Sequence, residues 1–189
     1  MKNFLALLLF TFISIEAITQ ERIRFSLQNF AGLLTGENGS GVQFQTISGI
    51  RYKKWNAGIG TGIDGYYSFS SPVFLSLNRS IFKRGKNDFS LSINGGINLP
   101  WKNVQNHYES FWGYKITKLT GAYWQGCVNY GISLGKRKHI LLAQAGFSYK
   151  HMGEIMKQTV INPPSPGDQD TYRYDYYLKT LSFKIGWEF

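Results

Sequence analysis

An alternation of apolar and polar side chains constrains this 189-residue chain more than any other feature. It is clearest over residues 180–189, where Leu181, Phe183, Ile185, Trp187 and Phe189 alternate with Thr, Ser, Lys, Gly and Glu. Successive side chains of a β-strand point to opposite faces, so this segment is predicted to be a strand with one apolar and one polar wall. The same alternation predicts seven more strands, over residues 23–33, 42–53, 55–64, 72–82, 89–99, 122–134 and 139–150.

The composition of the polar track decides between architectures. A soluble sandwich or a lipocalin-like barrel would turn this track to water, and a soluble exterior is rich in Lys and Glu. Here the track is mostly Gly, Ser, Asn and Gln, which suits the crowded interior of a narrow barrel, whereas the apolar track carries aromatic residues near the strand ends. We therefore predict an all-β protein, an eight-stranded antiparallel up-and-down transmembrane β-barrel. Three residues break the alternation, since Ile47 and Phe74 lie on the polar track and Arg79 on the apolar one.

The predicted connections fall into two groups. Those after the second, fourth and sixth strands are short and basic, whereas those after the first, third, fifth and seventh are mostly longer, at 34–41, 65–71, about 100–121 and about 151–177. Short periplasmic turns and longer outer loops are typical of outer-membrane barrels. This predicts that both ends of the barrel domain lie on the periplasmic side.

The first 20 residues have the features of a secretory signal peptide. A positive charge at Lys2 precedes an apolar run from Phe4 to Ile15, and cleavage is expected after Ala17 or nearer Gln20. An N-terminal membrane anchor is the alternative interpretation. The prediction is thus a cleaved segment, 1–20, followed by one barrel domain, 21–189. Cys127 is the single cysteine of the sequence, which excludes an internal disulfide, and it is expected to fill space in the interior.

The sequence resembles the small outer-membrane β-barrel proteins of Gram-negative bacteria, in the OmpA/OmpX-like size class and of the type found in Bacteroidetes. The resemblance rests on the signal peptide, on the Gly-Ile-Gly-Thr-Gly-Ile-Asp run at 58–64, and on the last strand, 183–189. It implies a location in the cell outer membrane of a Gram-negative envelope. The alternating residues of the last strand are similar to the signal read by the barrel-assembly machinery, and these residues are Phe183, Ile185, Trp187 and Phe189.

Some barrels of this size are enzymes that modify lipid A with a His and a Ser, and the basic group must lie within hydrogen-bond reach of the hydroxyl. The weak candidates in this chain are His107, Ser110, His151 and Glu154, and the sequence contains no His-x-Ser. We therefore expect no enzymatic activity, with a lipid A acyl hydrolase or transferase as the alternative. A small-solute channel is a second alternative, although an eight-stranded barrel is only just wide enough to be filled by its own side chains.

No cofactor is expected, and His107 with Glu109, or Asp168 with Asp170, has too few ligands for a specific metal site. The net charge of +10 does not indicate nucleic-acid binding, because the basic turns would face anionic lipid head groups. Inside the barrel, we expect Arg24 to pair with Glu188 at closure.

The expected function is non-enzymatic: to stabilise the envelope, or to bind a partner through the outer loops. The expected partners are outer-membrane lipids, lipopolysaccharide, the assembly machinery and a surface protein or ligand. The aromatic residues proposed to form this contact are Tyr108, Phe111, Trp112, Tyr114, Tyr172 and Tyr174.

Overall fold

The protein is an all-β structure of nine strands in the computed structural model, which describes residues 23–101, 114–134, 139–159 and 169–189. No helix within these ranges is long and apolar enough to cross a membrane. The strands are β1 (Arg24–Gly36), β2 (Gly39–Tyr52), β3 (Trp55–Asp64), β4 (Ser70–Arg84), β5 (Asn87–Pro100), β6 (Tyr114–Leu119), β7 (Gly121–Leu134), β8 (His139–Thr159) and β9 (Gln169–Glu188).

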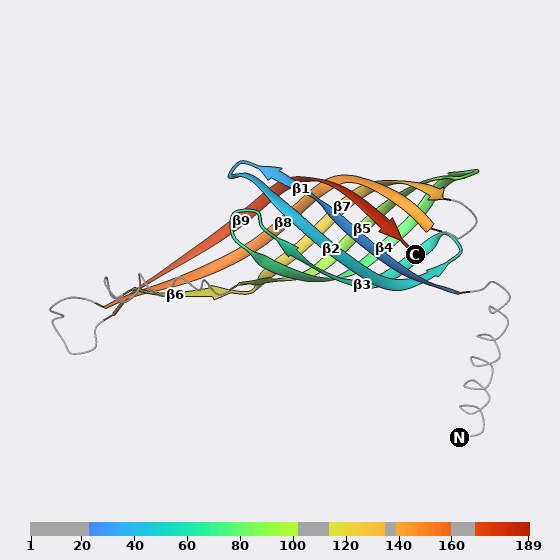
Figure 1. The fold of residues 1–189 in the computed structure, drawn as a ribbon. Coiled ribbons are helices and arrows are strands. Elements are labelled where there is room, and N and C mark those ends of the chain that lie inside the picture. Colours follow the sequence, from blue (N-terminus) through green and yellow to red (C-terminus); the bar gives the residue numbers. More distant parts are fainter. Residues whose placement is uncertain (1–22, 102–113, 135–138, 160–168) are drawn as a thin grey trace, which may run out of the picture.

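Eight of these strands form a closed ring, in which each pairs with two antiparallel neighbours (Figure 1). The order around the ring is β1-β2-β3-β4-β5-β7-β8-β9, and β9 returns to pair with β1 from Gln28↔Glu188 to Gly36↔Thr180. The predicted eight-stranded antiparallel barrel is therefore confirmed. Closure leaves the backbone of the ring without a free sheet edge.

The two ends of the barrel differ. At the end where β1 begins and β9 finishes, here called the turn end, β2–β3 and β4–β5 are joined by tight turns at 53–54 and 85–86 (Figure 1). Gly85 has a φ of +60°, a left-handed conformation that glycine adopts without steric cost. The opposite end is called the loop end.

Two predicted loops at the loop end are wrong. The connection expected over 34–41 is a turn of only two residues, because β1 and β2 stay paired as far as Gly36↔Gly39. The connection expected over 151–177 is largely strand, since β8 and β9 remain paired out to Thr159↔Gln169. Strand β6 was not predicted, and it pairs with this outer part of β8.

These additions form a sheet that projects beyond the ring (Figure 1). We call it the extension, and it consists of β6, residues 151–159 of β8 and residues 169–177 of β9. The ring neighbours of β8 and β9 stop short of it, because the β7–β8 pairing ends at Tyr123↔Lys150 and the β1–β9 pairing at Gly36↔Thr180. The extension is therefore supported by its own three strands.

The alternation along each strand separates two walls as predicted. The exterior wall of the ring exposes large apolar side chains, such as Leu75, Ile185 and Phe183, at 68%, 67% and 55%. The interior is dominated by buried amides, hydroxyls and a few charges. Arg79 lies on the exterior wall, and its guanidinium carbon is 4.9 Å from the centre of the Trp55 ring.

The interior also contains one apolar layer. Ile47 and Phe74, the two residues out of place on the polar track, are both buried inside the barrel at 5% and 2% exposure. They join a cluster whose other members are Phe30, Tyr123, Ile140 and Leu142. Interior glycines make room for this layer, since a Cβ on Gly60 would overlap the Phe74 ring.

Candidate functional site

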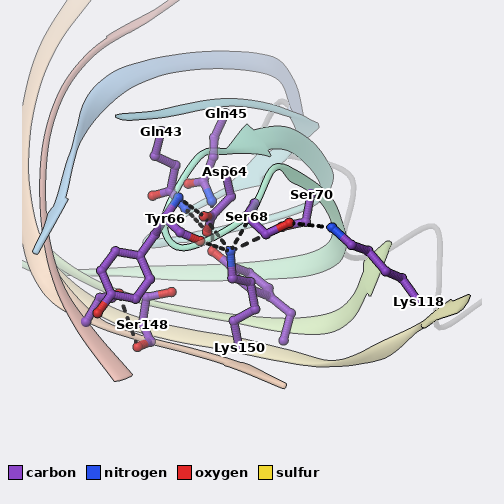
Figure 2. Close-up of polar contacts among 11 residues, drawn as sticks. Gln43, Gln45, Asp64, Tyr66, Ser68, Ser70, Lys118, Ser148 and Lys150 are labelled. Atoms are coloured by element: carbon purple, nitrogen blue, oxygen red, sulfur yellow. Dashed lines mark hydrogen bonds and ion pairs between the residues drawn. The ribbon is translucent and has the colours of Figure 1, made fainter. Parts of the chain in front are cut away.

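The most elaborate polar site lies inside the barrel near the loop end, around Lys150 of β8 (Figure 2). The Lys150 ammonium donates to Asp64 Oδ1, the last residue of β3, at 2.7 Å. Both side chains are almost completely buried, with exposures of 3% and 1%. A buried pair of opposite charges offsets its loss of hydration only when the remaining donors and acceptors are also satisfied.

The remaining groups are supplied by the segment between β3 and β4. Lys150 Nζ also donates to the backbone oxygen of Tyr66 at 2.9 Å and to Ser70 Oγ at 3.2 Å. Asp64 Oδ1 in turn accepts from the Tyr66 backbone N–H at 3.0 Å. On the far side of this segment, Lys118 of β6 donates to Ser68 Oγ at 2.8 Å (Figure 2). The site therefore fastens residues 65–69 across the loop end and ties the base of the extension to the barrel.

A second charged group lies deeper in the barrel. Lys184 of β9 is buried, and its ammonium donates to Gln45 and, at 2.9 Å, to Gln125. The same ammonium is 5.6 Å from the centre of the Phe30 ring. Amide oxygens and a ring face thus surround this cation next to the apolar layer.

The third charged group is near the turn end and corrects a prediction. Glu188 Oε2 accepts from Arg51 Nη2 and from Gln28 Nε2, both at 2.8 Å, so the partner of Glu188 is Arg51 and not Arg24. Arg24 and Arg51 lie opposite each other on β1 and β2, four residues along β1 from Gln28, the residue opposite Glu188. Of the two arginines, Arg51 is the one whose side chain reaches the Glu188 carboxylate inside the ring. Arg24 is exposed.

The extension presents two different faces. One continues the interior side of the barrel and has two cross-strand rows, Ile116–Met156–Tyr172 and Lys118–Glu154–Tyr174. On it Tyr172 and Tyr174 are exposed at 47% and 44%. At its base Tyr176 packs against Tyr67, with ring centres 5.2 Å apart. Hydrogen bonding to Tyr67, together with desolvation, raises the pKa of Tyr176 to about 12.

The opposite face of the extension is polar. His151 stacks on Tyr177 with ring centres 5.0 Å apart, and its Nε2 is 3.1 Å from Asp175 Oδ1. Arg173 Nε also donates to Asp175, at 3.1 Å. These hydrogen bonds, with that from Arg173 contributing most, hold the pKa of the Asp175 carboxyl below its usual value.

The weak catalytic candidates do not converge where they are described. His151 and Glu154 lie on opposite faces of β8, because they are three residues apart on one strand. His107, Ser110, Tyr108, Phe111 and Trp112 lie outside the described residues, as does the side chain of Tyr114. Within the described ranges, no cluster of three or more His, Cys, Asp or Glu residues has the arrangement of a metal site.

The residues of the expected assembly signal lie on the exterior wall of β9, except Phe189, which follows the last residue of the strand. Phe183, Ile185 and Phe189 are exposed at 55%, 67% and 57%, and Trp187 at 36%. His139 of β8 packs against the Trp187 and Phe189 rings, with centres 5.8 and 5.4 Å apart. Recognition of this strand by an assembly machinery remains a prediction.

The sequence predicted which charged side chains point into the barrel, but it did not predict which of them pair with one another. Lys150, Lys184 and Asp64 lie on predicted inward tracks and are buried, and Arg51, on the inward track of β2, contacts Glu188. The pairing of Lys150 with Asp64, 86 positions apart, depends on the stagger of the closed ring. No sequence signal marks strand β6, because its Ile-Thr-Lys-Leu sequence at 116–119 does not alternate between apolar and polar residues.

No family model and no curated protein sequence matches the chain. Comparison with solved structures finds similarity to the outer membrane protein AlkL, determined by solid-state NMR in DMPC lipid bilayers, at 10% identity and a TM-score of 0.42. That alignment covers 90% of each chain. The chain is also similar to a major outer membrane protein from Thermus thermophilus, at 13% identity and a TM-score of 0.46, over 88% of this chain and 98% of the other.

Proposed function

We propose that this protein is an integral outer-membrane β-barrel without enzymatic activity, which presents the extension as a contact surface outside the membrane. The observation that carries this proposal is the inverted polarity of the ring, with a polar interior and a wall of exposed large apolar side chains. Soluble monomers rarely expose apolar patches of more than a few hundred Å², whereas a spanning barrel needs an apolar band.

Aromatic residues support the membrane location. At the loop end, Trp124 stacks with Tyr149, with ring centres 6.0 Å apart, and at the turn end Trp187 lies beside Phe189. Aromatic girdles of this kind lie at the two interfaces of membrane barrels. In this orientation, the extension projects into the external medium and the basic turns face the periplasm.

The partner proposed for the extension is lipopolysaccharide. Its exposed tyrosines offer flat apolar surface to sugar rings. On the tyrosine face Lys118 and Glu154 balance each other, whereas on the opposite face the described cations Lys157, Arg173 and, at the base, Lys179 outnumber Asp175. The described part of the extension as a whole therefore carries more cations than carboxylates and would attract anionic phosphate groups.

The first test of this proposal is heat-modifiability in the outer-membrane fraction. A folded membrane barrel should migrate differently on a gel before and after boiling, and the protein should stay in that fraction. A soluble periplasmic protein with no such shift would contradict the membrane location.

The second test concerns the tyrosine face. The double substitution Tyr172→Ser and Tyr174→Ser is expected to weaken binding of purified lipopolysaccharide to the barrel in lipid vesicles by about tenfold, since exposed aromatic anchors carry much of an interface's affinity. The matched control is Tyr177→Ser, which removes an exposed tyrosine from the opposite face of β9. Equal loss in both variants, or in neither, would contradict the assignment of this face.

The two alternatives have their own measurements. A lipid A acyl hydrolase would change the mass of lipid A on expression, and the change would disappear on substitution of His107 or His151. A solute channel would give stepwise conductance in planar bilayers. The apolar layer of Phe30, Ile47, Phe74 and their neighbours across the interior supports the expectation that no such conductance is seen.

A further inference from the structure

The exterior wall of the ring is not uniformly apolar. Between the strand ends, non-aromatic side chains that can hydrogen-bond on this wall are confined to β1, β2 and β3, with Arg79 near the turn end as the exception among the described strands. We call this group the polar seam, and it consists of Asn29, Thr46, Ser48 and Thr61.

The members of the seam are neighbours in the sheet. Asn29 lies opposite Thr46, and Thr46 lies opposite Thr61, so the three form one cross-strand row. Thr46 Oγ1 donates to Asn29 Oδ1 at 2.9 Å. The amide nitrogen of Asn29 has no hydrogen-bond partner among the described residues.

The seam lies at a depth that lipid head groups do not reach. Thr46 is in the middle of β2, seven residues from Gly39 and six from Tyr52. Acyl chains at this depth offer neither donors nor acceptors, so an amide left unpaired in hydrocarbon is strongly unfavourable. A partner with polar side chains at the same depth would satisfy it.

The exterior wall is hollowed at the seam. A groove of about 720 Å³ runs along the seam, and Asn29, Thr46 and Thr61 are among its lining residues. Large apolar side chains flank them, and these are Phe44, Ile63, Leu141, Ile185 and Trp187. The groove therefore has hydrogen-bonding side chains at its centre and apolar side chains around them, and the apolar border can stay in contact with lipid.

We propose that the polar seam is the contact surface of a homodimer, in which two copies meet wall to wall in the membrane. Both copies cross the membrane in the same direction, so the two-fold axis is parallel to the membrane normal and each seam faces the other. The seam is self-complementary, because Asn29 supplies donors and the hydroxyls of Thr46, Ser48 and Thr61 both donate and accept. This inference rests on the proposed location in the membrane.

Disulfide cross-linking of the full-length protein in its native outer membrane tests the proposal. The variant Thr46→Cys places a thiol close to the proposed two-fold axis, and the thiols of the two copies are expected to form a disulfide under mild oxidation. The matched control is Val128→Cys, at an exposed position on β7, the strand opposite β2 in the ring. Cys127 is buried and points inward, so the unsubstituted protein provides the blank.

A second variant removes the seam without a new thiol. The double substitution Asn29→Leu and Thr46→Val is expected to convert a dimer in unboiled samples to a monomer while the heat-dependent shift of the barrel remains. A heat-modifiable monomer in the unsubstituted protein, or equal cross-linking at positions 46 and 128, would overturn the dimer alone. Absence of the protein from the membrane would overturn the proposed function, and the dimer with it.

Discussion

Both halves of strand β9 alternate in sequence, but the same side of the strand carries polar residues in the ring and tyrosines in the extension. Within the ring, its even-numbered residues Ser182 and Lys184 are buried, at 0% and 3% exposure. Ten residues earlier, Tyr172 and Tyr174 continue the same side of the strand and are exposed at 47% and 44%. The difference arises because the ring encloses one side of β9, whereas the extension is a three-stranded sheet with both faces open. Alternation therefore determines which residues share a face, and closure determines what that face meets.

The largest expected effect comes from breaking the buried ion pair that fastens the loop end of the ring. Lys150→Met leaves the Asp64 carboxylate buried without its cation, and we expect a loss of about 3–5 kcal/mol in the free energy of unfolding. Urea titration of the protein in lipid vesicles, followed by tryptophan fluorescence, measures it. The double variant Asp64→Leu and Lys150→Met should recover part of the loss, and a single variant as stable as the parent would contradict the role of the pair.

A smaller effect is expected from an interior glycine. In Gly60→Ala, the new Cβ overlaps the Phe74 ring, so the apolar layer must shift, at a cost of about 1–3 kcal/mol. Gly95→Ala on the exterior wall is the matched control, because nothing lies within 4 Å of its added Cβ. The same urea titration compares the two variants. Equal effects would mean that the interior is less tightly packed than the structure indicates.

Shortening the extension should change stability still less. Replacing residues 154–174 by Asn-Gly joins Gly153 to Asp175, which already face each other across β8 and β9. An Asn-Gly pair favours the two-residue turn of a β-hairpin. We expect a change in unfolding free energy within about 1 kcal/mol, because the described residues of the deleted segment pair only with each other and with β6. Loss of the heat-dependent shift would show instead that the barrel depends on the extension.

The smallest effect concerns the polar face of the extension. Arg173→Gln is expected to raise the pKa of Asp175 toward its ordinary value, since the Arg173 hydrogen bond is the main cause of its depression. A depressed carboxyl pKa contributes stability above the unfolded-state pKa, and that contribution is lost as pH falls through the folded-state pKa. Removal of the Arg173 hydrogen bond should therefore weaken the dependence of the extension's stability on acid pH. NMR titration of the Asp175 carboxyl measures the change in its pKa. Arg79→Gln, on the barrel wall, should leave this titration unchanged.

The sequence alone predicts the strands of the ring and the side of each strand that faces outward. The alternation in Leu181, Phe183 and Ile185 was sufficient to predict the strand and its exterior face, and the same argument holds around the ring. It was also sufficient to place Lys184 and Glu188 inside. Their partners could not be predicted, because Arg51 reaches Glu188 only through the stagger of three strands that meet at closure.

The extension was the weakest part of the sequence interpretation. The prolines Pro163, Pro164 and Pro166 predict a turn, and this turn signal favours the prediction of a loop over 151–177. The alternation of Tyr172, Tyr174 and Tyr176 with Arg173 and Asp175 was nevertheless present. In proteins, tyrosine is found at lipid interfaces, in packed loops and on open sheets. The two-residue period of these tyrosines therefore predicts a strand but does not indicate its surroundings.

The bonds of Glu188 have a consequence for how the molecule is made. This one carboxylate holds Gln28 and Arg51, which are 160 and 137 positions earlier in the chain. None of these contacts can form before the intervening strands have paired into the sheet, and long-range pairing of this kind slows folding. The contact therefore forms only when all the strands of the ring are in place, and a barrel whose assembly stops midway is not stabilised by it.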